Sequence, residues 1–166
     1  MKKTLIVIDM QNDFIDGSLG TAEAVKIVPN VRKKIEEYRS NGDEIIFTRD
    51  THGEDYLSTP EGKKLPVVHC VKNTHGWQIA DGLDVPDAIH IDKPSFGYTH
   101  WDKFCFEKIE LVGLCTDICV VSNALILKAL FPNAEISVDS ACCAGVTTET
   151  HNSALATMKM CQIDVV

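Results

Sequence analysis

Short apolar runs alternate with amphipathic stretches along the chain, in the order expected of strands and helices. Residues 4–8 form a continuous β-prone run, which is the pattern of a strand buried on both faces. Residues 23–40 instead repeat apolar side chains at helical spacing and close on Asn41-Gly42, a typical helix end. The same reading predicts further strands at residues 44–48, 88–91, 108–114, 134–138 and 162–166, and further helices at residues 118–130 and 148–160.

This alternation predicts an α/β fold, a three-layer Rossmann-like arrangement with a mainly parallel six-stranded sheet and helices on both faces. With 166 residues, 45% of them hydrophobic, the chain has the size and apolar content of one domain spanning residues 1–166. Residues 53–86 lack a regular pattern. Because so long an irregular stretch in a compact domain is usually functional, we expect part of it to cover a site.

Polar side chains follow the ends of four predicted strands. Asp9, Asp50 and Lys93 come after the first three strands, and the segment Cys115–Cys119 comes after the fourth. In a parallel sheet these ends share one edge, where open α/β folds place their sites. Each residue alone is also typical of a turn or a helix cap, but their convergence predicts a functional site at that edge.

The residue types at this edge suit nucleophilic catalysis. Cys119 is predicted in the first turn of a buried helix, where the partial positive charge of the N–H groups favours a thiolate. Asp9 can take the thiol proton and Lys93 can stabilise the negative charge. Main-chain N–H groups of the same turn can bind an oxyanion.

Charge and hydropathy exclude two classes of partner. A formal net charge of −8 argues against nucleic acid, and Arg32-Lys33-Lys34 is typical of the solvated face of a helix. No apolar run approaches the ~20 residues that a membrane span needs. The run after Lys2-Lys3 stops at Asp9, too short for a secretory signal. We therefore expect a cytoplasmic protein that binds neither nucleic acid nor membrane.

The seven cysteines do not form the pattern of a disulfide scaffold. Their number is odd and they are scattered among apolar residues, which favours a reducing compartment and mostly buried thiols. The adjacent pair Cys142-Cys143 has neither the spacing of a redox motif nor that of a structural zinc site.

Three segments resemble the signature motifs of the isochorismatase-like cysteine hydrolases, in the same order. They are Asp9-Met10-Gln11-Asn12-Asp13-Phe14, Lys93, and Gly113-Leu114-Cys115-Thr116-Asp117-Ile118-Cys119-Val120. The resemblance implies that Asp9 is a general base, that Lys93 stabilises the thiolate, and that Cys119 attacks the carbonyl of a small amide. It also implies a cis peptide between Leu114 and Cys115, with the N–H groups of Cys115 and Cys119 forming the oxyanion hole.

A second group, Asp50-x-His52 with a later His69, offers one carboxylate and two imidazoles. Such a set suits Zn, Mn or Fe with positions left open, although the short D-x-H motif by itself is common and is more often a turn aspartate with a surface histidine. The nicotinamidase branch of the family resembles the chain here, which implies a divalent metal held by these three residues. No organic cofactor is expected.

The substrate pocket departs from the nicotinamidase pattern. Leu65-Pro66-Val67-Val68 stands where an aromatic Trp-Pro-Pro-type segment is usual, and Phe96-Gly97-Tyr98-Thr99 replaces a Ser-Ala-Phe type. We expect a rebuilt pocket whose aromatic lining comes from Phe14, Trp77, Phe96 and Tyr98, with Trp101 as a further candidate, although ordinary packing explains each aromatic side chain as well.

Family members commonly form dimers or tetramers, so the resemblance also implies a homo-oligomer. Two alternatives stay open, a vinyl-ether hydrolase of the isochorismatase type and a non-catalytic binding module on the same fold. A nucleotide-binding Rossmann domain is disfavoured, because Asp9-Met10-Gln11 stands where its glycine-rich turn would follow the first strand.

Overall fold

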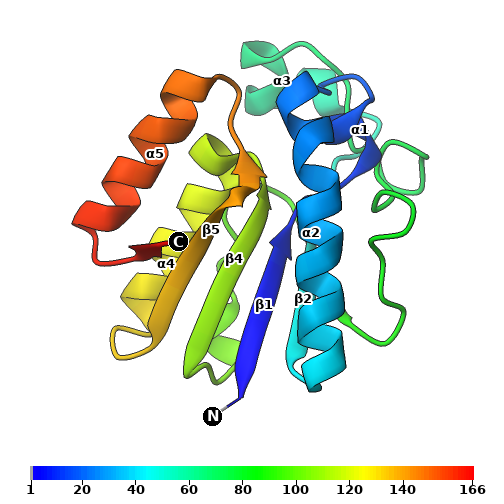
Figure 1. Ribbon diagram of the computed structural model, residues 1–166. Coiled ribbons are helices and arrows are strands. Elements are labelled where there is room, and N and C mark those ends of the chain that lie inside the picture. The colour runs from blue at the N-terminus through cyan, green and yellow to red at the C-terminus, as the bar shows by residue number, and fades with distance from the viewer. Residues whose placement is uncertain (1) are drawn as a thin grey trace.

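The computed structural model describes residues 2–166, whose strands join in one parallel sheet (Figure 1). The six strands lie in the order β3-β2-β1-β4-β5-β6. Because the connections run outward to one side from β1 and then to the other from β4, a crevice opens beyond the ends of these two strands. The strand bounds are β1 Lys3–Ile8, β2 Glu44–Asp50, β3 Ile89–Lys93, β4 Lys108–Leu114, β5 Glu135–Ala144 and β6 Asp164–Val165.

Helices cover both faces of this sheet. The long α2 crosses one face, and α4 and α5 pack on the other, as Figure 1 shows. α2 starts where the Thr21 hydroxyl accepts a hydrogen bond from Ala24 N at 3.0 Å, and it ends at Gly42 with a left-handed φ of 72°. The helix bounds are α1 Asn12–Ile15, α2 Ala22–Asn41, α3 Pro60–Lys64, α4 Val121–Leu130 and α5 Thr148–Met160.

The core lies on both sides of the sheet because the central strands carry apolar residues on both faces. In β1, Ile6 and Ile8 pack on the α4 and α5 side, whereas Leu5 and Val7 pack on the α2 side, and none of the four is exposed. This double burial explains the continuous apolar run in the sequence. The predicted fold class is therefore confirmed, and the sheet is parallel throughout its described strands.

Most boundaries differ from the prediction by at most two residues, and two differ by more. β5 continues to Ala144, past a shift in its register with β4, because bulged residues break the alternation that sequence patterns detect. The predicted helix 118–130 is α-helical only from Val121, and a π-helical turn over Thr116–Val120 precedes it. Cys119 therefore lies in a widened turn rather than in the first turn of α4.

The irregular stretch after β2 folds back over the carboxyl ends of the strands. It contains the short 3₁₀ turn Tyr56–Ser58 and α3, and it pairs with the site edge through single bridges at His52–Val71 and Gln11–Ile79. In Figure 1, α1 and α3 lie beyond the arrowheads of the strands. No helix among residues 2–166 combines the length and apolar character needed to cross a bilayer.

Candidate active site and metal-ligating cluster

Asp9, Lys93 and Cys119 meet beyond the ends of β1, β3 and β4. Asp9 directly follows β1, Lys93 is the last residue of β3, and Cys119 lies in the π-helical turn. Since β2 separates β3 from β1, only a long side chain on β3 can reach Asp9. The three side chains lie out of solvent, at 0%, 0% and 5% exposure.

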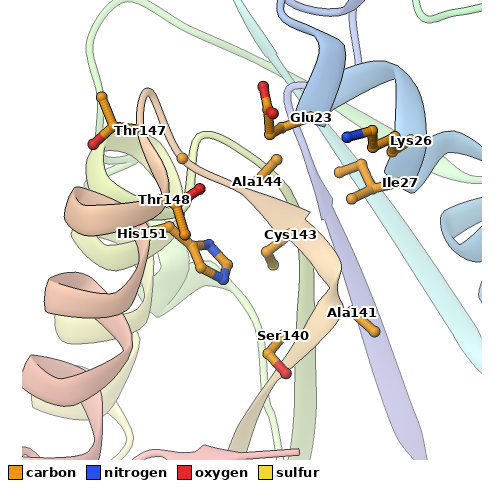
Figure 2. A pocket seen from close by; sticks show the side chains of 11 residues that line it. Glu23, Lys26, Ile27, Ser140, Ala141, Cys143, Ala144, Thr147, Thr148 and His151 are labelled. Carbon is orange, nitrogen blue, oxygen red and sulfur yellow. The ribbon is translucent and has the colours of Figure 1, made fainter.

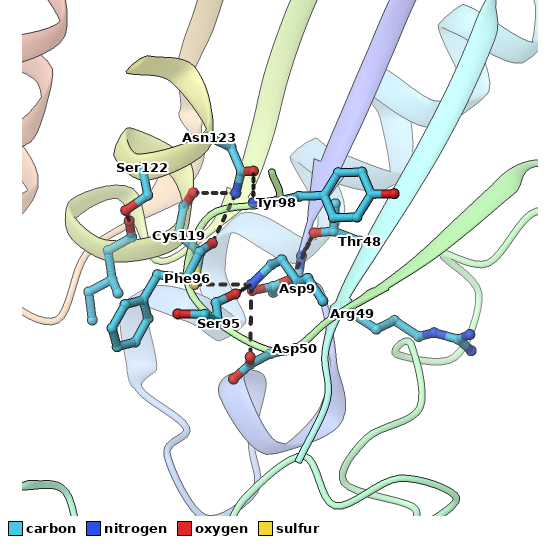
Figure 3. Close-up of polar contacts among 12 residues, drawn as sticks. Asp9, Thr48, Arg49, Asp50, Ser95, Phe96, Tyr98, Cys119, Ser122 and Asn123 are labelled. Atoms are coloured by element: carbon cyan, nitrogen blue, oxygen red, sulfur yellow. Dashed lines mark hydrogen bonds and ion pairs between the residues drawn. The ribbon is translucent and has the colours of Figure 1, made fainter. Parts of the chain in front are cut away.

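Lys93 contacts both other members of the group, Asp9 and Cys119, which Figure 3 labels. Its Nζ lies 2.6 Å from Asp9 Oδ2 and 3.5 Å from Cys119 Sγ, and it donates to the carbonyl of Ser95 at 3.1 Å. The Thr48 hydroxyl donates to Asp9 Oδ1 at 2.7 Å. Asp9 Oδ2 lies against the Lys93 ammonium, and as a carboxylate oxygen it can accept a proton.

Burial governs the protonation of the cysteine. It raises the pKa of the Cys119 thiol well above its usual value, the charge of Asp9 raises it further, and Lys93 only partly offsets these effects. Burial therefore opposes the thiolate that the sequence predicts at Cys119. The thiol is neutral until a base removes its proton.

The two charged neighbours are also shifted by burial. Burial raises the pKa of Asp9 above its usual value, against the opposing effect of the Lys93 charge. For Lys93, burial disfavours the ammonium, but attraction to Asp9 and Cys119 outweighs it and leaves the pKa raised. A neutral thiol beside a carboxylate of raised pKa is a suitable donor and acceptor pair for proton transfer.

A four-residue cluster lies beside this group. Asp50 Oδ2 is 2.9 Å from His52 Nε2 and 3.5 Å from His69 Nε2, and Glu61 Oε1 is 3.7 and 3.9 Å from the same two nitrogens. The carbonyl of Val67 lies 2.7 Å from His69 Nδ1 and orients that ring. One ligand atom from each of the four side chains lies within 4.8 Å of the others.

These residues fit a divalent transition metal. Two imidazoles and two carboxylates are a donor set that Zn, Mn and Fe accept. Asp50 Oδ2 faces both imidazoles, as a metal ligand would, whereas its Oδ1 lies 3.9 Å from Lys93 Nζ. Burial opposes ionisation of Asp50, but hydrogen bonds from His52 and His69 and the charge of Lys93 hold its pKa well below the usual range.

Glu61 was missed by sequence reasoning. It lies in the first turn of α3, within the stretch that has no regular pattern, and a single glutamate there has no motif spacing to the other ligands. Only the folding of this stretch back over β2 brings it near His52 and His69.

A cavity of about 180 Å³ opens onto Cys119 and the metal-ligating cluster. Most of its wall is apolar, and the Phe14 and Phe96 side chains line it as expected. Leu65, Phe96 and Val146 at its rim are 41%, 41% and 56% exposed. The lining residues are Phe14, Leu19, Thr21, Asp50, Leu65, His69, Phe96, Cys115, Ile118, Cys119 and Val146.

Trp77 and Tyr98 do not line this cavity, which corrects the expectation for both. The Trp77 indole donates to the Thr51 hydroxyl at 2.9 Å, and the Arg49 guanidinium lies 4.0 Å above its ring, so the tryptophan is held at the outer side of β2. Tyr98 packs edge-on against Trp101 at 5.0 Å between ring centroids. Both rings therefore pack outside the cavity.

The turn that carries Cys119 is anchored at both sides. The peptide bond between Leu114 and Cys115 is cis, at the position that the motif implied. Thr116 Oγ1 lies 2.7 Å from Nδ1 of His151 on α5, and the Asp117 carboxylate accepts from the N–H of Val146 at 3.1 and 3.2 Å. These contacts hold the turn against the segment that follows β5.

A second cavity of about 250 Å³ lies between α2, the end of β5 and the start of α5 (Figure 2). Cys143 and Ala144 form its floor, with Lys26 on one side and His151 on the other. None of the residues around it belongs to the triad or to the metal-ligating cluster, so its larger volume does not make it the reaction site.

Comparisons with known proteins show the family of the chain. The sequence model described as Isochorismatase domain matches residues 3–166. An uncharacterized isochorismatase family protein of Bacillus subtilis is 31% identical over 143 residues, covering 75% of this chain and 78% of that protein. The nicotinamidase of Schizosaccharomyces pombe is 27% identical over 209 residues, covering 98% of this chain and 91% of its own.

Solved structures and one further relative extend the comparison. The pyrazinamidase of Pyrococcus horikoshii in complex with zinc superposes with a TM-score of 0.83 at 28% identity, covering 100% of this chain and 99% of its own. A protein of Arabidopsis thaliana named probable inactive nicotinamidase is 32% identical over 178 residues, covering 93% of this chain and 87% of its own.

Proposed function

Because the chain belongs to the isochorismatase family, we propose that it is a cysteine-dependent amidohydrolase, which converts a small primary amide to a carboxylic acid and ammonia as nicotinamidases do. The observation that carries the proposal is the position of Lys93 Nζ, 2.6 Å from Asp9 and 3.5 Å from Cys119, the residue of the three that lines the apolar cavity. Similarity to a nicotinamidase and to a pyrazinamidase supports the amide as substrate.

In the first half of the reaction, the cysteine displaces ammonia. Asp9 Oδ2 takes the proton of the Cys119 thiol as sulfur attacks the amide carbon, and the carbonyl π electrons move to oxygen. The N–H groups of Cys115 and Cys119 stabilise the oxyanion. When the tetrahedral intermediate collapses, the C–N bond breaks and Asp9 returns its proton to the leaving nitrogen, leaving a thioester.

In the second half, water replaces the sulfur. Asp9 removes a proton from the water as its oxygen attacks the thioester carbon, the C–S bond then breaks, and the Cys119 sulfur recovers a proton from Asp9. Lys93 keeps its charge throughout and stabilises the negative charge that moves between Asp9 and the sulfur. Burial of all three side chains strengthens these interactions by excluding water.

Asp50, His52 and His69, joined by Glu61, would hold a divalent metal beside the cavity. A metal bound there supplies a Lewis-acidic position that fixes a substrate donor atom or a water molecule. Since Asp50 and His69 also line the cavity, the chain's own residues place that position within reach of a ligand next to Cys119.

Two alternatives remain for the test to separate. A vinyl-ether hydrolase on this fold has no use for a thiol nucleophile, so the buried Cys119 beside Lys93 disfavours it. An inactive binding protein is the second alternative, and the similarity to a probable inactive nicotinamidase raises it directly. The intact set of Asp9, Lys93 and Cys119 favours catalysis.

The proposal is tested by measuring ammonia release from a panel of small aliphatic and heteroaromatic primary amides. We expect turnover of at least one amide, its loss in Cys119→Ala, and a thioester adduct on Cys119 by intact-mass spectrometry after an acid quench. Cys105→Ser is the matched control, because Cys105 is exposed and remote from the cavity, and it should retain activity. Full activity in Cys119→Ala, or no turnover of any amide by the metal-loaded protein, would contradict the proposal.

The same geometry decides which thiols an alkylating reagent reaches first. Cys105 and Cys161 are exposed, whereas Cys119 is buried with a raised pKa. Rapid iodoacetamide labelling is therefore expected at the exposed pair, and labelling of Cys119 has to be followed by peptide mapping.

A further inference from the structure

The segment between β3 and the 3₁₀ turn Trp101–Lys103 has no regular structure, yet it forms one wall of the reaction cavity. It begins next to Lys93 and carries Phe96, which lines the cavity. A wall built on irregular backbone needs polar partners elsewhere, because its N–H and C=O groups make few bonds within the segment. Those partners determine where Phe96 lies relative to Cys119.

The Asn123 side chain supplies these partners. Its Oδ1 accepts from Tyr98 N at 2.9 Å and from the Trp101 indole at 3.0 Å, and its Nδ2 donates to the carbonyl of Phe96 at 3.1 Å. The remaining Nδ2 hydrogen goes to the carbonyl of Cys119 at 2.8 Å. Figure 3 shows this amide between the two segments.

Asn123 therefore uses its full hydrogen-bonding capacity, two donated and two accepted bonds. Its side chain is fully buried, so any bond lost on substitution is not replaced freely by water. Three of these bonds fix the Phe96–Trp101 segment, and the fourth fixes the nucleophile turn. One side chain thus sets the distance between the pocket wall and the reacting sulfur.

Close packing at Gly97 also brings the Phe96–Trp101 segment against α4. A Cβ at this position would lie 2.5 Å from Ile126 Cδ1 and 3.6 Å from Ser122 Cβ, both on α4. The segment therefore rests directly on α4, next to Asn123. This tight fit belongs to the part of the chain where the sequence departs from the usual nicotinamidase pattern.

We propose that Asn123 is a positioning residue for substrate binding, which holds the Phe96 wall of the cavity at a fixed place relative to Cys119. The inference rests on the proposed amidase function and adds to it the residue that shapes the pocket. Asn123 does not touch the substrate and acts only through Phe96 and the backbone of Cys119. Its two connections can be separated by substitution.

Asn123→Thr separates them, because a hydroxyl on a helix can donate to the carbonyl four residues earlier but cannot reach the Phe96–Trp101 segment. Ser122 makes the same bond to Ile118 at 2.6 Å, and Thr157 makes it to Ser153 at 3.0 Å. We expect Asn123→Thr to raise KM about tenfold while kcat stays within about twofold, the signature of lost binding rather than lost chemistry.

Three further variants complete the experiment. Asn123→Leu removes both connections and should lower kcat as well as raise KM. Gly97→Ala places a methyl group against Ile126 Cδ1, the mobile end of a side chain, without touching Asn123, and should leave kcat unchanged. Ser122→Ala is the matched control, since it removes a neighbouring bond of the same kind that does not reach the segment, and it should change neither constant.

A readout that does not need turnover keeps the inference testable if no amide is hydrolysed. The mapped rate of Cys119 alkylation is compared for iodoacetamide and for its N-benzyl derivative, whose ring must fit against Phe96. Asn123→Thr should change the ratio of the two rates at least threefold, while urea unfolding monitored by circular dichroism verifies that the variant is folded. An unchanged ratio and KM in folded Asn123→Thr, or equal losses of kcat in the Thr and Leu variants, would overturn the inference.

Discussion

Removing the charge of Lys93 should destabilise the fold strongly, because it leaves a carboxylate buried alone. Lys93 and Asp9 are both fully buried and lie 2.6 Å apart. Lys93→Met keeps the length of the side chain but removes the ammonium, and breaking a buried pair in this way costs about 3–5 kcal/mol. Asp9 would then hold its proton at neutral pH, since burial already raises its pKa.

This loss is large against the about 5–15 kcal/mol by which a typical domain is stable. For a chain of this size each kcal/mol corresponds to roughly 2–4 °C in Tm, so Lys93→Met should melt about 6–20 °C below the wild type. Guanidinium unfolding followed by tryptophan fluorescence measures the change, because both Trp77 and Trp101 are buried.

The double variant Asp9→Asn/Lys93→Met tests the cause. Asparagine suits position 9 because it tolerates the left-handed φ of 47° and still accepts from Thr48. With no charge left unpaired, the double variant should regain at least about 2 kcal/mol over Lys93→Met. The matched control is Lys108→Met, whose partner Glu135 is exposed, and it should leave the midpoint unchanged. A stable Lys93→Met, or purely additive losses in the double variant, would refute the reasoning.

Four other expectations concern the metal, pH, packing and assembly. Elemental analysis should find about one transition metal per chain. The metal should be lost in His52→Ala and should be removed more readily by chelators in Glu61→Gln. An unchanged metal content in both variants would show that these residues do not bind the metal. Burial lowers the pKa of His151 below its usual 6.5, so the unfolded chain binds more protons and stability should fall as pH drops below about 6.5. Urea titrations at several pH values should show this slope, reduced in His151→Gln. Tyr38→Phe removes a 2.5 Å hydrogen bond to Glu110 and should lower unfolding free energy by about 1–3 kcal/mol, and an unchanged denaturation midpoint would mean that the bond contributes nothing. Light scattering should give a multiple of 18.3 kDa, as expected of a dimer or tetramer, and a fully active monomer would contradict it.

Local patterns in the sequence were sufficient to predict the order of elements and the location of the site. Runs such as residues 4–8 become central strands because burial on both faces favours apolar side chains at successive positions. Asp9, Lys93 and Cys119 could be placed together before any coordinates, since each follows a strand and parallel strands end at one edge. Asp50 and His52 lie at this edge for the same reason. His69 joins them because the irregular stretch, residues 53–86, crosses the same edge.

Only the tertiary structure decided the properties that depend on contacts between distant residues. The thiol pKa rises because Cys119 is buried by residues from several segments, which no motif records. Glu61 lies in the metal-ligating cluster and Trp77 lies outside the cavity, because the tertiary fold of residues 53–86 fixes the position of both. The sequence pattern indicates only that Asn123 is a polar residue within the apolar helix predicted at residues 118–130. Its role follows from four partners at 96, 98, 101 and 119, which are set by packing rather than by spacing along the chain.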